Sequence, residues 1–124
     1  MLEGKRIAVV VPAHDEEALI ASTLAGIPEL VDRVYVVDDA SRDATAARVE
    51  ELADPRVELI RHERNQGVGA AIVTGYTAAL RDRIDVTCVM AGDNQMDPDE
   101  LAVLAAGALV PLLVGRRLYD RADA

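Results

Sequence analysis

Short apolar runs that alternate with helical segments constrain the fold of this chain more than any other feature. The spacing of apolar residues predicts five strands, at residues 7–11, 34–37, 57–60, 86–90 and 110–114. It predicts helices between them, at residues 16–27, 44–52, 70–81 and 99–106. Because parallel strands need crossovers and these are right-handed, the βαβαβαβαβ order predicts an α/β fold, a mostly parallel sheet with helices on both faces.

Individual residues predict details of this fold. Pro12 is expected to stop the first strand, and Glu58 places the third strand nearer an edge because it interrupts an apolar run. Asp15 is the expected N-cap of the first helix, and Asp97 precedes Pro98 at the start of another. The length of 124 residues, with no repeat or linker, predicts a single domain over residues 1–124.

Composition excludes several classes of function. A net charge of −9 leaves no basic face for duplex nucleic acid, and 2% aromatic residues exclude a stacking platform for single strands. Lys5 is the single lysine, so no lysine-containing phosphate loop is present. Cys88 has no internal disulfide partner, which favours a cytoplasmic protein. The longest apolar stretch, residues 101–115, contains Pro111 and is too short to span a bilayer.

Acidic side chains gather in the loops that follow three of the predicted strands. These loops are residues 12–17, 38–41 and 92–97. In parallel sheets, ligands bind beyond the carboxyl ends of the strands, where the strand order switches. Acids that begin a helix are also favoured by the helix dipole, and this structural interpretation explains residues such as Asp15.

The dipole interpretation explains Asp38, Asp39 and Asp93 less well, because they directly follow strands. Like charges at one edge repel unless a cation or a hydrogen-bonding group lies between them. A divalent metal and a nucleoside are both suitable, and a nucleoside diphosphate with a metal satisfies both. Gly67 and Gly69 open the helix of residues 70–81, so their loop either faces an anion or simply turns the chain.

Five motif-like segments follow one another along the chain, at residues 10–17, 36–45, 65–71, 90–98 and 114–117. In this order they resemble the motifs V-P-A-Y-N-E-E, V-D-D-x-S-x-D-x-T, N-x-G-x-G-A, D-A-D-G-Q-x-D-P and V-G-S-R. These are the usual motifs of family 2 (GT-A fold) glycosyltransferases. The polyprenyl-phosphate (dolichol-phosphate-type) sugar transferases are the branch that the segments resemble most.

The resemblance implies a three-layer, Rossmann-like GT-A fold and transfer of a sugar from a nucleotide-diphosphate donor, with inversion, to an acceptor such as a polyprenyl phosphate. It implies that Asp39 hydrogen-bonds the base or ribose, and that Asp93 and Gln95 bind Mg²⁺ or Mn²⁺ bridging the diphosphate. It also leaves open a position at the inner face of the membrane. The donor-binding residues that it implies are Pro12, Ala13, His14, Glu16, Asp39, Gly67, Gly69 and Asp93.

Departures from the family pattern define alternatives. Ala91 stands where the family has the first Asp of its D-x-D motif, and the family's acceptor half follows the V-G-S-R segment, so we expect a donor-binding domain without that half. The motifs assign no catalytic base. A non-catalytic nucleotide-sugar-binding module or fragment is therefore the alternative to an enzyme, and self-association is expected near Leu112 and Leu113. A dinucleotide oxidoreductase is disfavoured because residues 12–14 lack glycine.

Overall fold

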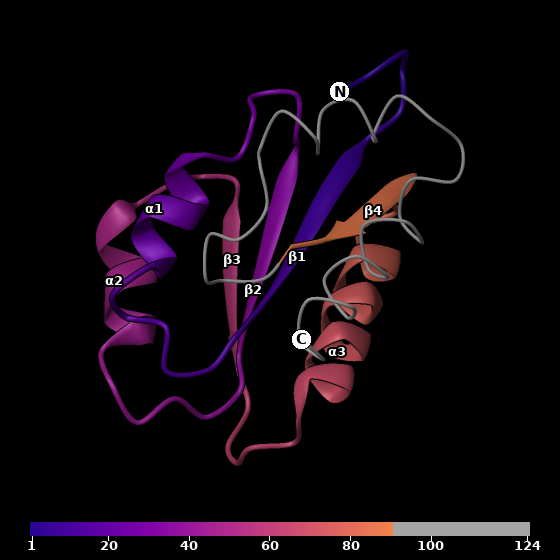
Figure 1. The fold of residues 1–124 in the computed structure, drawn as a ribbon. Coiled ribbons are helices and arrows are strands. Elements are labelled where there is room, and N and C mark those ends of the chain that lie inside the picture. Colours follow the sequence, from indigo (N-terminus) through magenta and orange to yellow (C-terminus); the bar gives the residue numbers. More distant parts are fainter. Residues whose placement is uncertain (91–124) are drawn as a thin grey trace, which may run out of the picture.

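The computed structural model describes residues 1–90, which form a sheet with helices on both faces (Figure 1). Strands and helices alternate along the chain, as the sequence predicts. In chain order the elements are β1 (Ile7–Ala13), α1 (Ile20–Ala25), β2 (Arg33–Asp38), α2 (Thr45–Leu52), β3 (Val57–Arg61), α3 (Val68–Arg81) and β4 (Val86–Val89).

The described strands are all parallel and lie in the order β3-β2-β1-β4. The chain adds β2 and β3 on one side of β1 and then places β4 on its other side. Because the crossovers are right-handed, this reversal puts α1 and α2 on one face and α3 on the other (Figure 1). The strand order therefore switches beside β1. As Glu58 predicts, β3 lies at one end of the described sheet, where that side chain pairs with Arg33 and Arg81.

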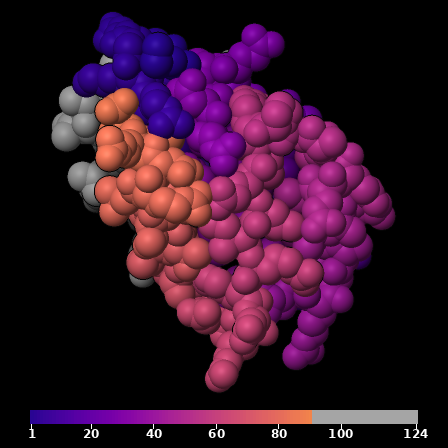
Figure 2. Space-filling model, turned by 180° about the vertical axis from the view of Figure 1, so that it is seen from behind, coloured from indigo at the N-terminus to yellow at the C-terminus, as the bar shows by residue number. Residues whose placement is uncertain are grey.

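The core has two layers because successive side chains of a strand point to opposite faces. Val9 and Val11 of β1 pack toward α1 and α2, whereas Val10 packs toward α3. On that second face α3 contributes small side chains and Gly75, which brings the helix backbone close to the sheet. In the space-filling view, the pink-to-orange segments that hold β3, α3 and β4 form one continuous surface (Figure 2).

Two local predictions are wrong. The strand β1 runs through Pro12 to Ala13. The backbone of Pro12 faces β4, whose pairing with β1 ends at Val10, so the N–H that proline lacks is not needed there. The helix α1 begins at Ile20 rather than at residue 16, with Leu19 in the N-cap position. Asp15 is therefore not a cap; it adopts a φ of 52°, in the left-handed region, within the preceding loop.

None of the helices within residues 1–90 has the length and hydropathy of a membrane span.

Several predictions lie outside the described residues. The predictions outside are the strand of residues 110–114, the helix of residues 99–106, the cap Asp97, the metal ligands Asp93 and Gln95, and the self-association surface near Leu112 and Leu113.

Candidate functional site

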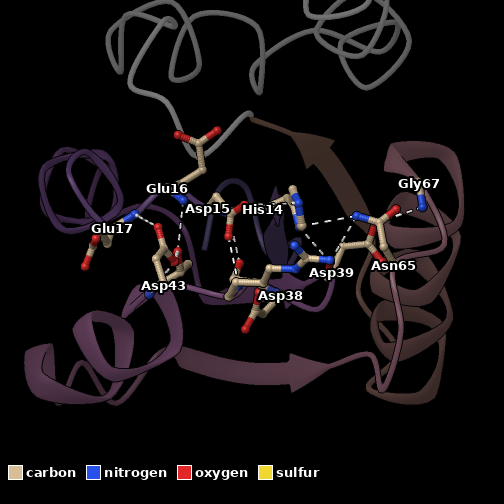
Figure 3. A network of polar contacts seen from close by, with 12 residues as sticks. His14, Asp15, Glu16, Glu17, Asp38, Asp39, Asp43, Asn65 and Gly67 are labelled. Carbon is tan, nitrogen blue, oxygen red and sulfur yellow. Dashed lines mark hydrogen bonds and ion pairs between the residues drawn. The ribbon is translucent and has the colours of Figure 1, made fainter.

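A cavity of about 320 Å³ opens at the carboxyl edge of the sheet, where β1 and β2 end and α3 begins. This is the place that the switch in strand order predicts. Figure 3 shows His14, Asp39 and Asn65 converging there from three loops. The cavity is lined by Pro12, Ala13, His14, Glu16, Asp39, Asn65, Gly67, Val68 and Ala71.

Six of the eight predicted donor-binding residues line this single cavity, although they come from three separate motifs. Gly69 does not line it, although it lies in the first turn of α3 between Val68 and Ala71, which both do. Asp93 lies outside the described residues. The predicted residues in the lining are Pro12, Ala13, His14, Glu16, Asp39 and Gly67.

Asp39 is the buried acid of the cavity, with 4% of its surface exposed. Its Oδ1 accepts hydrogen bonds from the Gln66 amide and from His62 Nδ1, each at 2.8 Å. Its Oδ2 accepts from the Gly67 amide at 2.8 Å. A carboxylate has about four acceptor positions. Donors from the described residues therefore fill both positions on Oδ1 and leave one on Oδ2.

These contacts keep Asp39 ionised. Burial alone raises the pKa of the carboxyl, but the hydrogen bonds from the Gln66 amide, His62 and the Gly67 amide outweigh it, so that the pKa lies below its usual range. An ionised carboxylate accepts hydrogen bonds and donates none. Its remaining position on Oδ2 therefore suits an N–H or O–H group of a ligand.

His14 and Asn65 form part of the rim and share one anchor. His14 Nδ1 donates to the backbone carbonyl of Asp39 at 2.8 Å, and Asn65 Nδ2 lies 3.3 Å from the same oxygen. The other ring nitrogen of His14 lies 3.3 Å from Asp15 Oδ2. The carbonyl of Asp39 thus fixes two polar side chains at the rim, while its carboxylate faces the loop of α3.

The loops of residues 14–19 and 39–44 are tied together by side chains, and we call them the paired loops. The Asp15 amide donates to Ser41 Oγ at 2.9 Å, and the Arg42 amide donates back to Asp15 Oδ1 at 2.8 Å. The Glu17 amide donates to Asp43 Oδ2 (Figure 3), and the Ala44 amide donates back to Glu17 Oε2. These bonds hold residues 15–17 out of α1 and explain its late start.

The sequence leaves open a cation or a hydrogen-bonding group as the partner of crowded acids, and Asp15, Glu17 and Asp43 of the paired loops have the second. Backbone amides of the opposite loop supply the hydrogen bonds. Asp38 accepts from the Ser41 amide at 3.0 Å, and its buried Oδ2 lies 3.4 Å from Arg61 Nε. Within residues 1–90, no three His, Cys, Asp or Glu side chains gather as a metal site.

Sequence reasoning missed His62 and the apolar wall of the cavity. His62 directly follows β3 and has no local motif that marks it as functional. Val68 and Ala71 stand one turn apart at the start of α3, and only the position of that helix brings them to the cavity. Asn65 does carry a signal, because it begins the glycine loop that resembles N-x-G-x-G-A.

Comparison with other proteins identifies relatives for nearly the whole chain. The family model described as glycosyl transferase family 2 matches residues 8–119. A UDP-N-acetylglucosamine–dolichyl-phosphate N-acetylglucosaminyltransferase of Methanococcus voltae is 30% identical over 116 residues, covering 82% of this chain and 46% of the relative. A polyprenol monophosphomannose synthase of Mycolicibacterium smegmatis is 32% identical over 120 residues, covering 91% and 45%. The chain thus spans under half the length of these curated relatives.

Solved structures with the same fold include complexes with nucleotide sugars. The mannosyltransferase PcManGT of Pyrobaculum calidifontis, in complex with GDP-Man and Mn²⁺, superposes with a TM-score of 0.68 at 28% identity, covering 82% of this chain and 31% of that one. Glucosyl-3-phosphoglycerate synthase of Mycobacterium tuberculosis, with Mn²⁺, UDP-Glc and phosphoglyceric acid, gives 0.64 at 26% identity, covering 90% and 41%. With its parallel sheet, its motif-bearing cavity and a family match over residues 8–119, the chain belongs to glycosyl transferase family 2 and has the GT-A fold.

Proposed function

We propose that this chain binds the nucleotide of a nucleotide-diphospho-sugar in the cavity beside β1, as the donor-binding part of an inverting glycosyltransferase. The observation that carries the proposal is the convergence of six predicted residues on one cavity whose buried carboxylate keeps an acceptor position on Oδ2. Among relatives and neighbours, the enzymes named above include one described as using UDP-N-acetylglucosamine and one bound to GDP-Man.

The lining matches the chemistry of a nucleoside. The side chains of Pro12, Val68 and Ala71 offer apolar contact to the faces of a planar base, while Asp39 Oδ2 accepts from an N–H of the base or an O–H of the ribose. The diphosphate then lies toward the first turn of α3, where amides without intrahelical partners favour an anion. His14 and Asn65 close the rim over the nucleoside.

A divalent cation, Mg²⁺ or Mn²⁺, belongs to this proposal through Asp93 and Gln95. The acids of residues 1–90 do not supply a metal site, and the carboxylates of Asp15, Glu17, Asp38 and Asp39 are already held by amides, His62 or Arg61. A carboxylate and an amide oxygen are ligands of the hard type that these cations prefer. The cation would neutralise charge that develops on the diphosphate leaving group.

The acceptor is proposed from the relatives, two of which are named for dolichyl phosphate and polyprenol. A lipid-linked phosphate would place the protein at the cytoplasmic face of a membrane. The alternative, binding of the donor without transfer, is favoured by Ala91, which replaces a metal-facing acid of the family motif. The two functions differ in whether nucleoside diphosphate is released when donor and polyprenyl phosphate are supplied together.

Isothermal titration calorimetry with UDP, GDP and their sugars, with and without Mn²⁺, tests the proposal. At least one nucleotide should bind, and Asp39→Asn should weaken it by about 10-fold or more, because a hydrogen bond to a charged acceptor is lost. Asp54→Asn is the matched control, since that carboxylate also accepts several hydrogen bonds but pairs with Arg56. No binding of any nucleotide by the unaltered chain refutes the proposed function.

A further inference from the structure

His62 connects the buried acid of the cavity to helix α3. It follows β3 directly, and its backbone amide donates to the Asp38 carbonyl at 2.9 Å, which continues the strand ladder by one residue. Its Nδ1 lies 2.8 Å from Asp39 Oδ1 and its Nε2 lies 2.8 Å from Thr74 Oγ1. The imidazole side chain is 8% exposed, and both of its nitrogens find partners within the protein.

The roles of these atoms follow from the carboxylate. Because ionised Asp39 only accepts, Nδ1 of His62 must carry a proton. In the neutral ring Nε2 is then an acceptor, and the hydroxyl of Thr74 donates to it. The ends of β2 and β3 and the middle of α3 are thereby joined in one chain of hydrogen bonds, Asp39–His62–Thr74.

We propose that His62 is a positioning residue for donor binding, which holds Asp39 in the orientation that leaves its Oδ2 position directed at the ligand. This inference rests on the proposed function and adds a residue that does not itself line the cavity. His62 occupies the second acceptor position of Oδ1, so rotation of the carboxylate would break its bond together with those of the Gln66 and Gly67 amides.

Two substitutions at position 62 distinguish this positioning role from simple packing, because their amide nitrogens match different ring nitrogens of His62. An asparagine at position 62 has an amide nitrogen at the same number of bonds from the backbone as Nδ1, so His62→Asn keeps a donor for Asp39. A glutamine has its amide nitrogen at the place of Nε2, so His62→Gln keeps a group for Thr74 and removes the donor for Asp39. Both variants are polar and neutral, and both leave comparable space in the core.

The experiment measures affinity for UDP and GDP by calorimetry, using whichever binds the unaltered 124-residue chain more tightly. Relative to that chain, His62→Gln should bind about 10-fold more weakly, as expected for one hydrogen bond to a charged group, and His62→Asn should recover most of the loss. Thr77→Val is the control on α3, because its hydroxyl donates only to the Val73 carbonyl among the described residues. It should leave the affinity unchanged.

Two further measurements exclude a purely structural effect. Urea unfolding of each variant reports stability, and the order of affinities should not follow the order of stabilities. The two-bond ¹H–¹⁵N spectrum of neutral His62 should show the Nδ1–H tautomer. Equal affinities of His62→Gln and the unaltered chain, or an Nε2–H tautomer, overturn the positioning role while nucleotide binding stands. Failure of the unaltered chain to bind either nucleotide overturns the proposed function and this inference together.

Discussion

The close approach of α3 to the sheet depends on Gly75. Replacing Gly75 tests the packing that positions the cavity-lining residues of α3. A Cβ atom built at Gly75 would overlap both γ carbons of Val10, one of them at 2.7 Å, and would lie 3.0 Å from its Cβ. Val10 is fully buried in the central strand β1. Because rotation about its Cα–Cβ bond leaves Cβ in place, the side chain cannot clear the space alone, and the backbones must separate.

The expected loss of stability follows from two opposing effects. Overpacking a filled core costs about 1–3 kcal/mol, and contact with three atoms of a branched side chain puts Gly75→Ala near the upper end. Alanine is favoured over glycine within a helix by about 1 kcal/mol. The free energy of unfolding should therefore fall by about 2 kcal/mol. The loss should be much smaller when Val10→Ala is introduced as well, because that substitution removes both γ carbons and leaves only the contact with Cβ at 3.0 Å.

Urea unfolding followed by far-ultraviolet circular dichroism measures these values, since the chain has no tryptophan. Gly69→Ala is the matched control for stability on the same helix, because a Cβ there meets nothing within 4 Å. It should be neutral or stabilising by up to about 1 kcal/mol. Equal stability of Gly75→Ala and Gly69→Ala, or an equal cost of Gly75→Ala with and without Val10→Ala, would show that Val10 does not limit the approach of α3.

Three further predictions concern other parts of the described fold. Arg56→Met should lower the free energy of unfolding by about 2 kcal/mol, because the Arg56 guanidinium donates to the Pro28 carbonyl at 2.8 Å and pairs with Asp54. Urea unfolding measures the loss, and Arg48→Met is the control because it removes only an exposed ion pair. Burial raises the pKa of the Cys88 thiol to about 11, so iodoacetamide should alkylate it slowly near neutral pH, and a rate equal to that in urea contradicts this. The lowered pKa of Asp39 contributes stability that is present above the unfolded pKa of 3.8 and is lost as the pH falls through the folded pKa. Between roughly pH 5 and pH 3, the urea midpoint should therefore fall more steeply for the unaltered chain than for Asp39→Asn.

The sheet and the location of the cavity could be predicted because their signals are local. Apolar runs mark the strands, and the rule for parallel sheets places the ligand beyond their carboxyl ends. The motif residues Pro12, Asp39 and Gly67 then meet in one cavity because β1, β2 and α3 bring their loops together. Even the position of β3 at one end of the described sheet followed from one charged residue, Glu58, within an apolar run.

The parts that could not be predicted depend on contacts between distant residues. Asp15 is of a residue type that often caps helices and lies just before one, but its carboxylate accepts from the backbone amide of Arg42, which is 27 residues away. His62 meets partners 23 and 12 residues away, in β2 and α3, and no nearby pattern indicates either contact. Side-chain hydrogen bonds of this kind compete with local preferences for helix or turn, and only the assembled fold decides the outcome.

The reciprocal ties between the paired loops have a consequence for anyone who wishes to redesign this protein. Each loop satisfies backbone amides of the other, so neither has a complete set of partners by itself. Grafting one segment from a homologue with different acids would leave amides of the remaining segment without acceptors. The paired loops, residues 14–19 and 39–44, should therefore be exchanged together, as one structural unit made of two separate segments.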